Sequence, residues 1–552
     1  MKKTGFLKGA AISIIGIVIC KVIGLVYVIP FYAIIGAQGG ALYSYAYSIY
    51  NVFLNLATSG IPVAMSKVVS EYNEMGFYHT KERTFKIGLK IISILCVISF
   101  LVLFIFAPDV AYLIIGGVKG GNTTEDVAMV IRIISTAILV VPFLSVSKGY
   151  LQGHKIMQVS SIADILEQLA RVFVILFGSF LTLKVFHLSL KTAVGVSVFG
   201  ATVGALVAYF YVFIKIKKSK DLKRNEKAKA EEAKITRNDL VRKIIFYALP
   251  FVVISLLESV FVLVDVFTVV KGLVGLGYTA KISENVVSVI ETWGSKLNMI
   301  VMAISTGIIT SLIPTIASSY AVKNYKEVNA KITQALQTLF LVVIPLSVGI
   351  SFMSKAVWTV FYGFDELNSS IFSLLILSQI PLAICSVSVN TNQSMNNTKA
   401  TITALVGALI AKMVLNIPMM NLFNKIGLEA YYATISLNIL IDTIELIWLL
   451  KQVKKKTNIS YLKTIRTFIK VIMCTIIMVL GLAIIKLFIP CYSVSRGVSM
   501  AYIALYGIVG ILIYFIVAYR SNTLADIVGT EMIEKIKQKV LKKIPKCDKL
   551  IK

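Results

Sequence analysis

The chain has 552 residues, of which 57% are apolar and only 15% are charged. Soluble globular proteins are typically about 45–50% apolar and about 25% charged. Together with a mean hydropathy of +0.84, this composition excludes soluble enzymes, soluble nucleic-acid-binding domains and disordered chains. At about 20 residues per helix, fourteen membrane spans need roughly 280 residues, which leaves enough for connectors. We therefore predict an all-α polytopic membrane protein with about 14 transmembrane helices.

The predicted spans are mostly apolar stretches bounded by charges, glycine or proline. The first follows the basic start Met1-Lys2-Lys3 and contains Lys21, and its apolar run is too long for a signal peptide, so we expect it to stay uncleaved. In chain order the spans cover residues 9–35, 40–65, 87–107, 128–150, 160–183, 192–214, 245–270, 294–318, 333–353, 370–392, 400–420, 430–450, 470–489 and 498–519.

Basic residues are in large excess over acidic ones. Lys and Arg number 56 against 27 Asp and Glu, a net charge of +29, which on a soluble protein would suggest a nucleic-acid partner. With the N-terminus in the cytoplasm, most basic residues fall in inner segments, as the positive-inside rule requires. The positive net charge is therefore explained without a nucleic-acid partner. We expect both termini inside, an even number of spans, and contacts with anionic membrane lipids.

The longest connector, residues 215–243, has 12 basic and 5 acidic residues and separates six predicted spans from eight. We interpret it as a solvated, partly helical linker beside anionic headgroups, with a specific partner site as the alternative. The predicted organisation is a six-helix lobe, this linker, a second six-helix lobe, two extra helices and a basic cytoplasmic tail. Their residues are 1–214, 215–243, 244–452, 453–520 and 521–552.

The two predicted lobes resemble each other at matching places. The corresponding pairs are Ser59-Gly60-Ile61 with Thr306-Gly307-Ile308, Ala107–Gly117 with Met353–Gly363, and Pro142 with Pro381. Because six spans is an even number, the two halves have the same orientation and are related by an axis along the membrane normal. Two similar bundles about such an axis predict a cleft that opens alternately to either side.

The sequence contains no group typical of a catalytic, metal or cofactor site. Six cysteines are spread without a Cys/His cluster, three histidines lie in connectors, and there is no Walker A sequence. A membrane glycosyltransferase or polymer ligase would need clustered acids or a sizeable outer loop, whereas the longest predicted outer loops, 108–127 and 271–293, have about 20 residues. We expect a protein that is not an enzyme and that needs neither a metal nor a cofactor.

Two lysines at membrane depth are candidates for binding an anion. A charge inside the bilayer costs at least about 2.5–3.5 kcal/mol, so it faces a cavity or pairs with another charge. Lys21 lies roughly 18 Å into the first span, and no charged residue occurs from Val22 to Ser66. Lys296 begins the eighth span. The alternatives are a distant carboxylate partner for Lys21 and snorkelling to the outer surface for Lys296.

Acidic residues at membrane depth are candidates for coupling or gating. Glu258 and Asp265 lie seven residues apart, and so on nearly one face of the seventh span. They could bind a proton or another coupling cation, or pair with a lysine. On the fifth span, Glu167 and Arg171 form an i,i+4 pair on an arc shared with Asp164. We favour a structural clamp there, with an inner gate as the alternative.

Two further groups are interpreted as structural. Lys412 on the eleventh span could reach Asp442, which shares a stripe of the twelfth span with Asn438 and Glu445. Tyrosines at helical spacing on the second span are expected to form an outer interfacial belt, with a sugar pathway as the alternative; these are Tyr43, Tyr47 and Tyr50.

Several segments resemble a known family. Residues 40–73, GALYSYAYSIYNVFLNLATSGIPVAMSKVVSEYN, resemble the second span and following loop of the bacterial polysaccharide flippases. The opening FLKGAAISIIGIVICKVIGLVYVIPFYAIIG and the pair KGYLQGHKIM and ILEQLARV are similar to the first span, fourth connector and fifth span of that group. The group belongs to the multidrug/oligosaccharidyl-lipid/polysaccharide (MOP) exporter superfamily. Over about residues 1–520 the chain looks like its lipid II flippases of the MurJ/YtgP type, and next like stage V sporulation protein B.

The resemblance implies fourteen helices in two MATE-like lobes around a central cavity, with two extra C-terminal helices. It implies transport of undecaprenyl-pyrophosphate-linked sugars to the outer leaflet, with cavity cations on the pyrophosphate and the lipid tail in a groove by the last two helices. Lys21 and Lys296 correspond to cavity arginines of relatives. Tyr27 and Asn55 fall near positions where the Gram-negative branch has further arginines, so they are included as candidate cavity residues.

The function predicted from the sequence is a flippase for lipid II or a related lipid-linked oligosaccharide in the bacterial cytoplasmic membrane, working by alternating access as a monomer with possible Na⁺ or H⁺ coupling. It would serve peptidoglycan synthesis in growth or in sporulation. The alternative is a MATE-type drug/cation antiporter, which would depend on acidic residues such as Glu258 and tolerate loss of Lys21.

Overall fold

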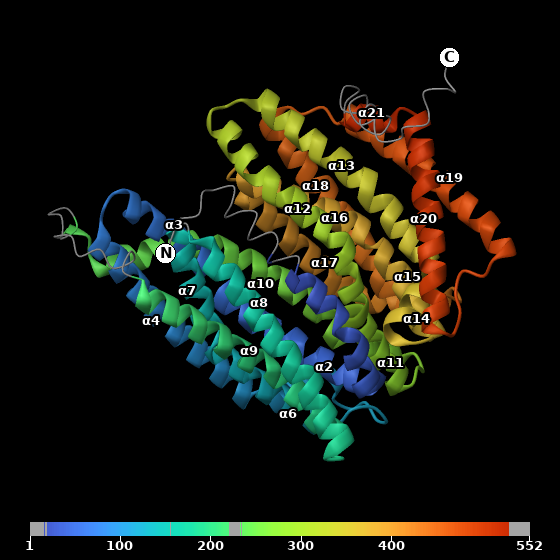
Figure 1. Cartoon of the computed structure of the whole chain (residues 1–552), viewed down its shortest axis with the longest axis horizontal. Helices are drawn as coiled ribbons and strands as arrows, with labels where there is room; N and C mark the ends of the chain where they lie inside the picture. The colour runs from blue at the N-terminus through green and yellow to red at the C-terminus, as the bar shows by residue number, and fades with distance from the viewer. Residues whose placement is uncertain (1–15, 17–18, 155, 220–231, 233, 529–552) are drawn as a thin grey trace, which may run out of the picture. The chain divides into compact units, whose positions relative to one another are not determined.

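The computed structural model describes residues 16, 19–154, 156–219, 232 and 234–528, and their regular structure is helical (Figure 1). Twelve helical segments among these residues are long and apolar enough to cross a membrane. The prediction of an all-α polytopic membrane protein is therefore confirmed. The start of the first predicted span (9–15, 17 and 18), the middle of the linker (220–231 and 233) and the end of the tail (529–552) lie outside the described residues.

The chain forms two compact units. Unit 1 comprises residues 1–297 and 405–437, and unit 2 comprises residues 298–404 and 438–552. The predicted lobes, 1–214 and 244–452, were defined by the similarity of their sequences, whereas the two units are defined by how compactly their residues pack. The division into lobes therefore stays a prediction. Three long helices contribute to both units: α12 (Gly294–Ala321), α17 (Thr398–Lys425) and α18 (Tyr431–Thr457).

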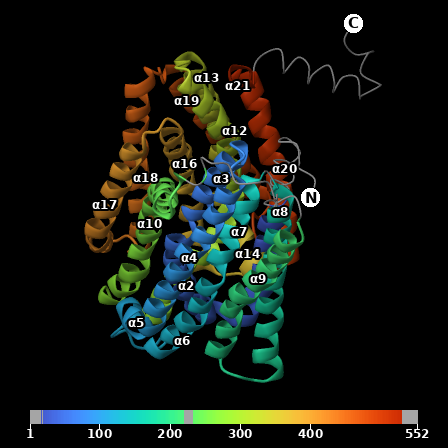
Figure 2. The ribbon, with the colours of Figure 1, turned by 90° about the vertical axis from the view of Figure 1, so that its left-hand side faces the viewer.

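Unit 1 contains the N-terminal helices and the seventh predicted span. In chain order its elements are α2 (Val28–Thr58), α3 (Ile61–Glu74), α4 (Tyr78–Ile105), α5 (Ala107–Ile115), α6 (Thr124–Ser135), η1 (Thr136–Leu139), α7 (Val141–Gly153), α8 (Met157–Phe173), η2 (Val174–Gly178), η3 (Leu181–Val185), α9 (Leu190–Lys218), α10 (Arg237–Gly275), α11 (Ala280–Ser288) and η6 (Val289–Trp293). Helices α8 and α9 run side by side, and α5 and α6 meet at one end of the unit (Figure 2).

Unit 2 contains the remaining helices. They are α13 (Tyr325–Phe352), α14 (Ser354–Tyr362), α15 (Glu366–Leu377), α16 (Gln379–Ser394), α19 (Leu462–Phe488), α20 (Arg496–Arg520) and α21 (Thr523–Val528). Helix α19 packs against both α13 and α20 (Figure 1). Apolar side chains along α19 and α20 stay exposed, as expected for helices that face lipid; examples are Ile476, Leu480 and Ile511.

Helix α2 contains a chain reversal that brings the first two predicted spans together. Gly36 has φ 66° and ψ −172°, a conformation that glycine alone adopts without strain. The hydroxyls of Tyr27 and Tyr43 lie 3.5 Å apart, although sixteen residues of straight helix would separate them by roughly 24 Å. The segment Val28–Glu74 therefore belongs to two spans. When α12 is counted as a further span, the number of spans agrees approximately with the predicted fourteen.

Two connectors that were predicted to be outer loops contain helices. The sequence predicted loops at 108–127 and 271–293, but these ranges include helices α5, α11 and η6. The sequence match between Ala107–Gly117 and Met353–Gly363 has a structural counterpart, because α5 and α14 both have nine residues and both end at a glycine C-cap. This local likeness supports the predicted internal repeat.

A buried glutamate joins these two connectors within unit 1. Glu284 of α11 is 2% exposed, and its carboxylate accepts hydrogen bonds from the backbone N–H of Asn122, at 2.9 Å, and from the Asn122 side chain. Burial raises the pKa of Glu284 to about 7, although the Asn122 hydrogen bonds oppose the shift. A Cβ on Gly121 would lie 1.9 Å from the Glu284 carboxylate, so this close contact requires glycine.

We predict that replacing Glu284 with Gln flattens the pH dependence of stability. A carboxyl group whose pKa is higher in the folded state stabilises the protein fully below pH of about 4.5, and this stabilisation is lost as the pH rises through about 7. The wild-type protein should therefore lose on the order of 3 kcal/mol between these pH values. Thermal unfolding in detergent from pH 5 to 8 measures this, and equal slopes for wild type and Glu284→Gln would contradict it.

Candidate functional site

An aromatic group within unit 1 surrounds one of the predicted cavity lysines. The Lys296 ammonium lies 5.8 Å from the centre of the Tyr27 ring. Tyr27 is buried near Tyr43, and Tyr43 stacks on Trp293 at a centroid distance of 6.2 Å. The reversal at Gly36 and the short helix η6 bring these residues together from distant parts of the chain. Two of the four predicted cavity residues, Tyr27 and Lys296, therefore lie close to each other.

The second predicted cavity lysine lies in the helical stretch before α2. Lys21 is half-buried and forms no ion pair or hydrogen bond with the described residues. The neighbouring segment packs along α8, since a Cβ on Gly16 would lie 3.1 Å from Ser161 and one on Gly24 would lie 3.4 Å from Gln168. Lys21 thus borders α8 without being neutralised by a carboxylate of the described chain.

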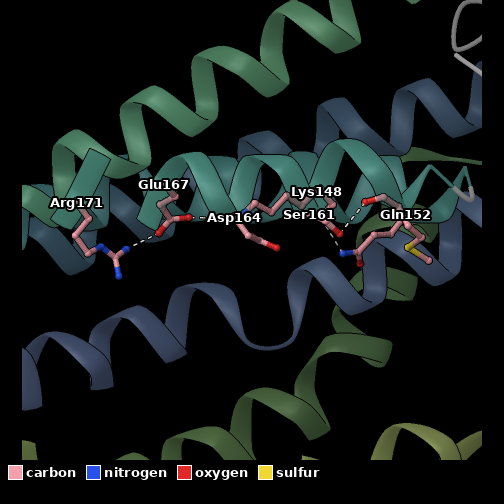
Figure 3. Close-up of polar contacts among 8 residues, drawn as sticks. Lys148, Gln152, Ser161, Asp164, Glu167 and Arg171 are labelled. Carbon is pink, nitrogen blue, oxygen red and sulfur yellow. Dashed lines mark hydrogen bonds and ion pairs between the residues drawn. The ribbon is translucent and has the colours of Figure 1, made fainter. Parts of the chain in front are cut away.

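Helices α7 and α8 are joined by a network of charged side chains (Figure 3). The Lys148 ammonium pairs with Asp164, and it lies 3.3 Å from Glu167. Glu167 in turn pairs with Arg171 one helical turn along α8. The predicted Glu167–Arg171 contact is present, and Lys148 completes a ladder in which each carboxylate contacts at least one cation. These contacts join α7 to α8, and the two roles predicted for Glu167 and Arg171, a structural clamp or an inner gate, both stay predictions.

A second group, the buried carboxylate cluster, combines Asp265, Glu291, Lys412 and Asn416. The Lys412 Nζ atom lies 2.7 Å from Asp265 Oδ2, and the two side chains are 1% and 2% exposed. The Asn416 amide donates to the other Asp265 oxygen at 3.1 Å. Glu291 of η6 is half-buried, and it lies near enough to Asp265 and Lys412 to interact with them electrostatically. The sequence suggested Asp442 for Lys412 and a deep lysine for Asp265; within unit 1 the ion pair joins Lys412 to Asp265.

Asn55, a predicted cavity residue of α2, contacts α10. The Asn55 side-chain amide donates to the Ser259 hydroxyl at 2.7 Å. Glu258, one residue earlier, is exposed and forms no hydrogen bond or ion pair with the described residues. Asp265, with which the sequence grouped Glu258, is instead buried and paired with Lys412. The coupling role predicted for both residues stays a prediction.

The predicted tyrosine belt is buried within unit 1. Tyr43 and Tyr50 are each 3% exposed, and the rings of Tyr43 and Tyr47 lie 4.4 Å apart. Arg171 lies near Tyr47 and Tyr50. The belt interpretation was wrong because helical spacing identifies a face of the helix without showing whether lipid or protein covers that face.

Four lysines of unit 1 differ in whether a carboxylate neutralises them. Lys148 and Lys412 are neutralised by carboxylates, whereas Lys21 and Lys296 have no carboxylate partner among the described residues. A lysine without a partner in apolar surroundings attracts an anion, because a phosphate then supplies the missing charge. Within the described residues, no group of three or more His, Cys, Asp or Glu could hold a metal ion.

Sequence reasoning missed two residues of these groups. Lys148 fell at the inner end of a predicted span, where lysine is common, and its partners are on another helix. Glu291 was assigned to an outer loop, because the π-helical turn that places it beside Asp265 has no recognised signature in the sequence. The one indication in the sequence that Glu291 lies near a span was its position two residues before Trp293, where the eighth predicted span begins.

Comparisons with known proteins agree with this fold. A family model described as "Polysaccharide biosynthesis protein" matches residues 6–320. The chain is 31% identical over 535 residues to "Lipid II flippase MurJ" of Bacillus subtilis (strain 168), covering 95% of this chain and 97% of that protein. It is 25% identical over 223 residues to "Stage V sporulation protein B" of the same organism, covering 40% of this chain and 41% of that protein.

Two solved structures show the same architecture. A lipid II flippase MurJ in an inward closed conformation matches with a TM-score of 0.66 and 17% identity, over 92% of this chain and 98% of that chain. An inward-facing multidrug resistance MATE family transporter of the MOP superfamily matches with a TM-score of 0.59 and 13% identity, over 80% of this chain and 99% of that chain. These matches confirm the MATE-like fold.

We predict that Lys412→Met destabilises the protein by about 3–5 kcal/mol, because it leaves the Asp265 carboxylate buried without its cation. The double variant Lys412→Met/Asp265→Asn removes both charges and should recover most of that loss. Thermal unfolding of the three proteins in the same detergent measures the effect. A Lys412→Met protein as stable as wild type would contradict the ion pair.

Proposed function

The chain belongs to the polysaccharide biosynthesis protein family, and on that premise we propose that it is a flippase for a lipid-linked cell-wall precursor, lipid II or a related polyprenyl-pyrophosphate-linked oligosaccharide. It is a multi-pass protein of the cytoplasmic membrane. The observation that carries the proposal is that Lys21 and Lys296 have no carboxylate partner among the described residues.

The chemistry of such a substrate explains why the two lysines matter. A pyrophosphate and its sugars cannot cross hydrocarbon unaided, because removing charged and polar groups from water costs many kcal/mol. An ammonium group that lacks a carboxylate offsets part of this cost through charge-assisted hydrogen bonds to phosphate oxygens. Tyr27 beside Lys296, and Asn55 beside Ser259, add hydroxyl and amide groups suited to sugars. The polyprenyl tail would remain in the lipid.

Transport would proceed by alternating access of the two predicted lobes to the two membrane surfaces. The excess of basic residues in the predicted inner segments supports cytoplasmic termini and contacts with anionic lipids. The membrane potential, or a gradient of Na⁺ or H⁺, would bias the direction, with Glu258 and Asp265 as candidate coupling residues and Glu167 and Arg171 as candidate gating residues. The protein would act as a monomer.

We predict that Lys21→Ala and Lys296→Ala each reduce flipping by about tenfold, because a hydrogen bond to a charged group contributes about 1.5–3 kcal/mol. Flipping is measured in proteoliposomes with lipid II, after the same amount of each variant has been reconstituted. Lys281→Ala is the matched control, because Lys281 is an exposed lysine of α11 that forms no ion pair. Flipping at the wild-type rate in the Lys21→Ala/Lys296→Ala double variant would reject the proposed site.

The MATE-type drug/cation antiporter is the second candidate, favoured by one observation: Glu258 is an exposed carboxylate of α10 without a partner in the described chain. Such an antiporter would extrude cationic drugs, lose that activity in Glu258→Gln and keep it in Lys21→Ala. A drug-efflux assay on the wild type and these two variants separates the candidates, because a flippase for lipid-linked precursors should extrude no drug in any of the three proteins.

A further inference from the structure

A cavity of about 520 Å³ lies within unit 1, where α4, α6 and α9 meet beside the start of α5. Its volume is within the range of about 300–1,000 Å³ that is typical of ligand pockets. Neither Lys21 nor Lys296 lines it, so it is separate from the candidate substrate site. The lining residues that matter here are Phe104, Glu125, Met129, Arg132, Ile133 and Phe199.

Two opposite charges line this cavity from the same helix. Glu125 and Arg132 are seven residues apart on α6, which places them nearly on one face and roughly 10.5 Å apart along the helix axis. Both are exposed, and neither forms an ion pair with a described residue. The other carboxylate of that helix turn, Asp126, is already paired with Lys191 at 3.1 Å. The cavity therefore offers one carboxylate and one guanidinium, and a ligand can supply the counter-charge of each.

The Arg132 guanidinium is held in position before any ligand binds. Its Nε–H group donates to the Phe104 carbonyl oxygen at 3.3 Å, and its central carbon lies 5.8 Å from the centre of the Phe104 ring. Its two terminal amino groups form no hydrogen bond with the described residues, so both remain available. A pair of guanidinium amino groups matches two oxygens of a phosphate.

The charges and the apolar side chains follow a fixed order from the membrane surface inward. Helices α6 and α7 form one candidate span, Thr124–Gly153, so Glu125 lies next to its surface end and Arg132 lies two turns deeper. The apolar side chains of Ile133 and Phe199 line the cavity beyond Glu125. In a phospholipid whose headgroup ends in an amine, the ammonium is likewise outermost, the phosphate lies beneath it and the acyl chains lie deepest.

We propose that this cavity binds a zwitterionic glycerophospholipid with a primary ammonium group, phosphatidylethanolamine. Arg132 holds the phosphate, Glu125 accepts hydrogen bonds from the ammonium, and Ile133 and Phe199 contact the acyl chains. Phosphatidylglycerol has no cation for Glu125, and the ammonium of phosphatidylcholine has no N–H group to donate. A free phosphate would leave Glu125 and the apolar walls unmatched. The site goes beyond the proposed flippase function and does not depend on it.

Lipid binding is measured by native mass spectrometry of the full chain, titrated in detergent with one lipid at a time. Wild type should bind phosphatidylethanolamine about tenfold more tightly than phosphatidylglycerol or phosphatidylcholine, because only the first satisfies both charges. Arg132→Gln should weaken the binding of phosphatidylethanolamine by about tenfold. Glu125→Gln should remove the preference among the three lipids. Arg237→Gln is the matched control, because Arg237 is an exposed arginine of α10 without an ion pair among the described residues, and it should bind as wild type does.

Equal affinity of wild type for the three lipids overturns the proposal, and so does unchanged binding in Arg132→Gln. A wild-type preference for phosphatidylglycerol also overturns it, because the occupant would then be an anionic lipid. Met129→Trp is a second variant, which fills the cavity and alters neither charge. Phosphatidylethanolamine should raise the unfolding temperature of wild type more than that of Met129→Trp, and an equal rise in both proteins contradicts the site. None of these measurements involves flipping, so they stand apart from the transport assays.

Discussion

The organisation of unit 1 depends on one constraint: a charge surrounded by apolar helices must be neutralised by something. Most charges at depth meet this constraint within the protein. Lys148 shares Asp164 and Glu167, and Lys412 is paired with Asp265 at 2.7 Å. These contacts join helices to one another within unit 1.

Lys21 and Lys296 have no carboxylate partner within the described chain, and this missing partner suggests that they bind an anionic ligand. The turn at Gly36 brings Tyr27 back against Tyr43 and places it beside Lys296. The fold thus presents an ammonium group together with aromatic and hydroxyl groups, which fits a ligand that is part anion and part sugar. The relatives of this chain include a protein named lipid II flippase MurJ, which agrees with this chemistry.

The sequence was sufficient to predict the all-helical membrane architecture, because apolar length is set by bilayer thickness and needs no knowledge of packing. The spans around α9, α10 and α13 follow their apolar stretches closely. Pairing between helices could not be predicted in the same way. The partner of Lys412 depends on how α17 lies against α10, and the burial of Tyr43 depends on the reversal at Gly36. The position of Glu291 could not be predicted, because the sequence of a π-helical turn cannot be distinguished from that of a loop.

Whether Lys21 and Lys296 bind the anionic part of the substrate is best measured as binding, without transport. Full-length protein in nanodiscs is titrated with a polyprenyl pyrophosphate that carries no sugar, and the dissociation constant is compared between wild type and Lys21→Gln/Lys296→Gln. We expect the double variant to bind at least about tenfold more weakly, with an affinity that depends less on salt concentration. Equal affinity and equal salt dependence in the two proteins would contradict it.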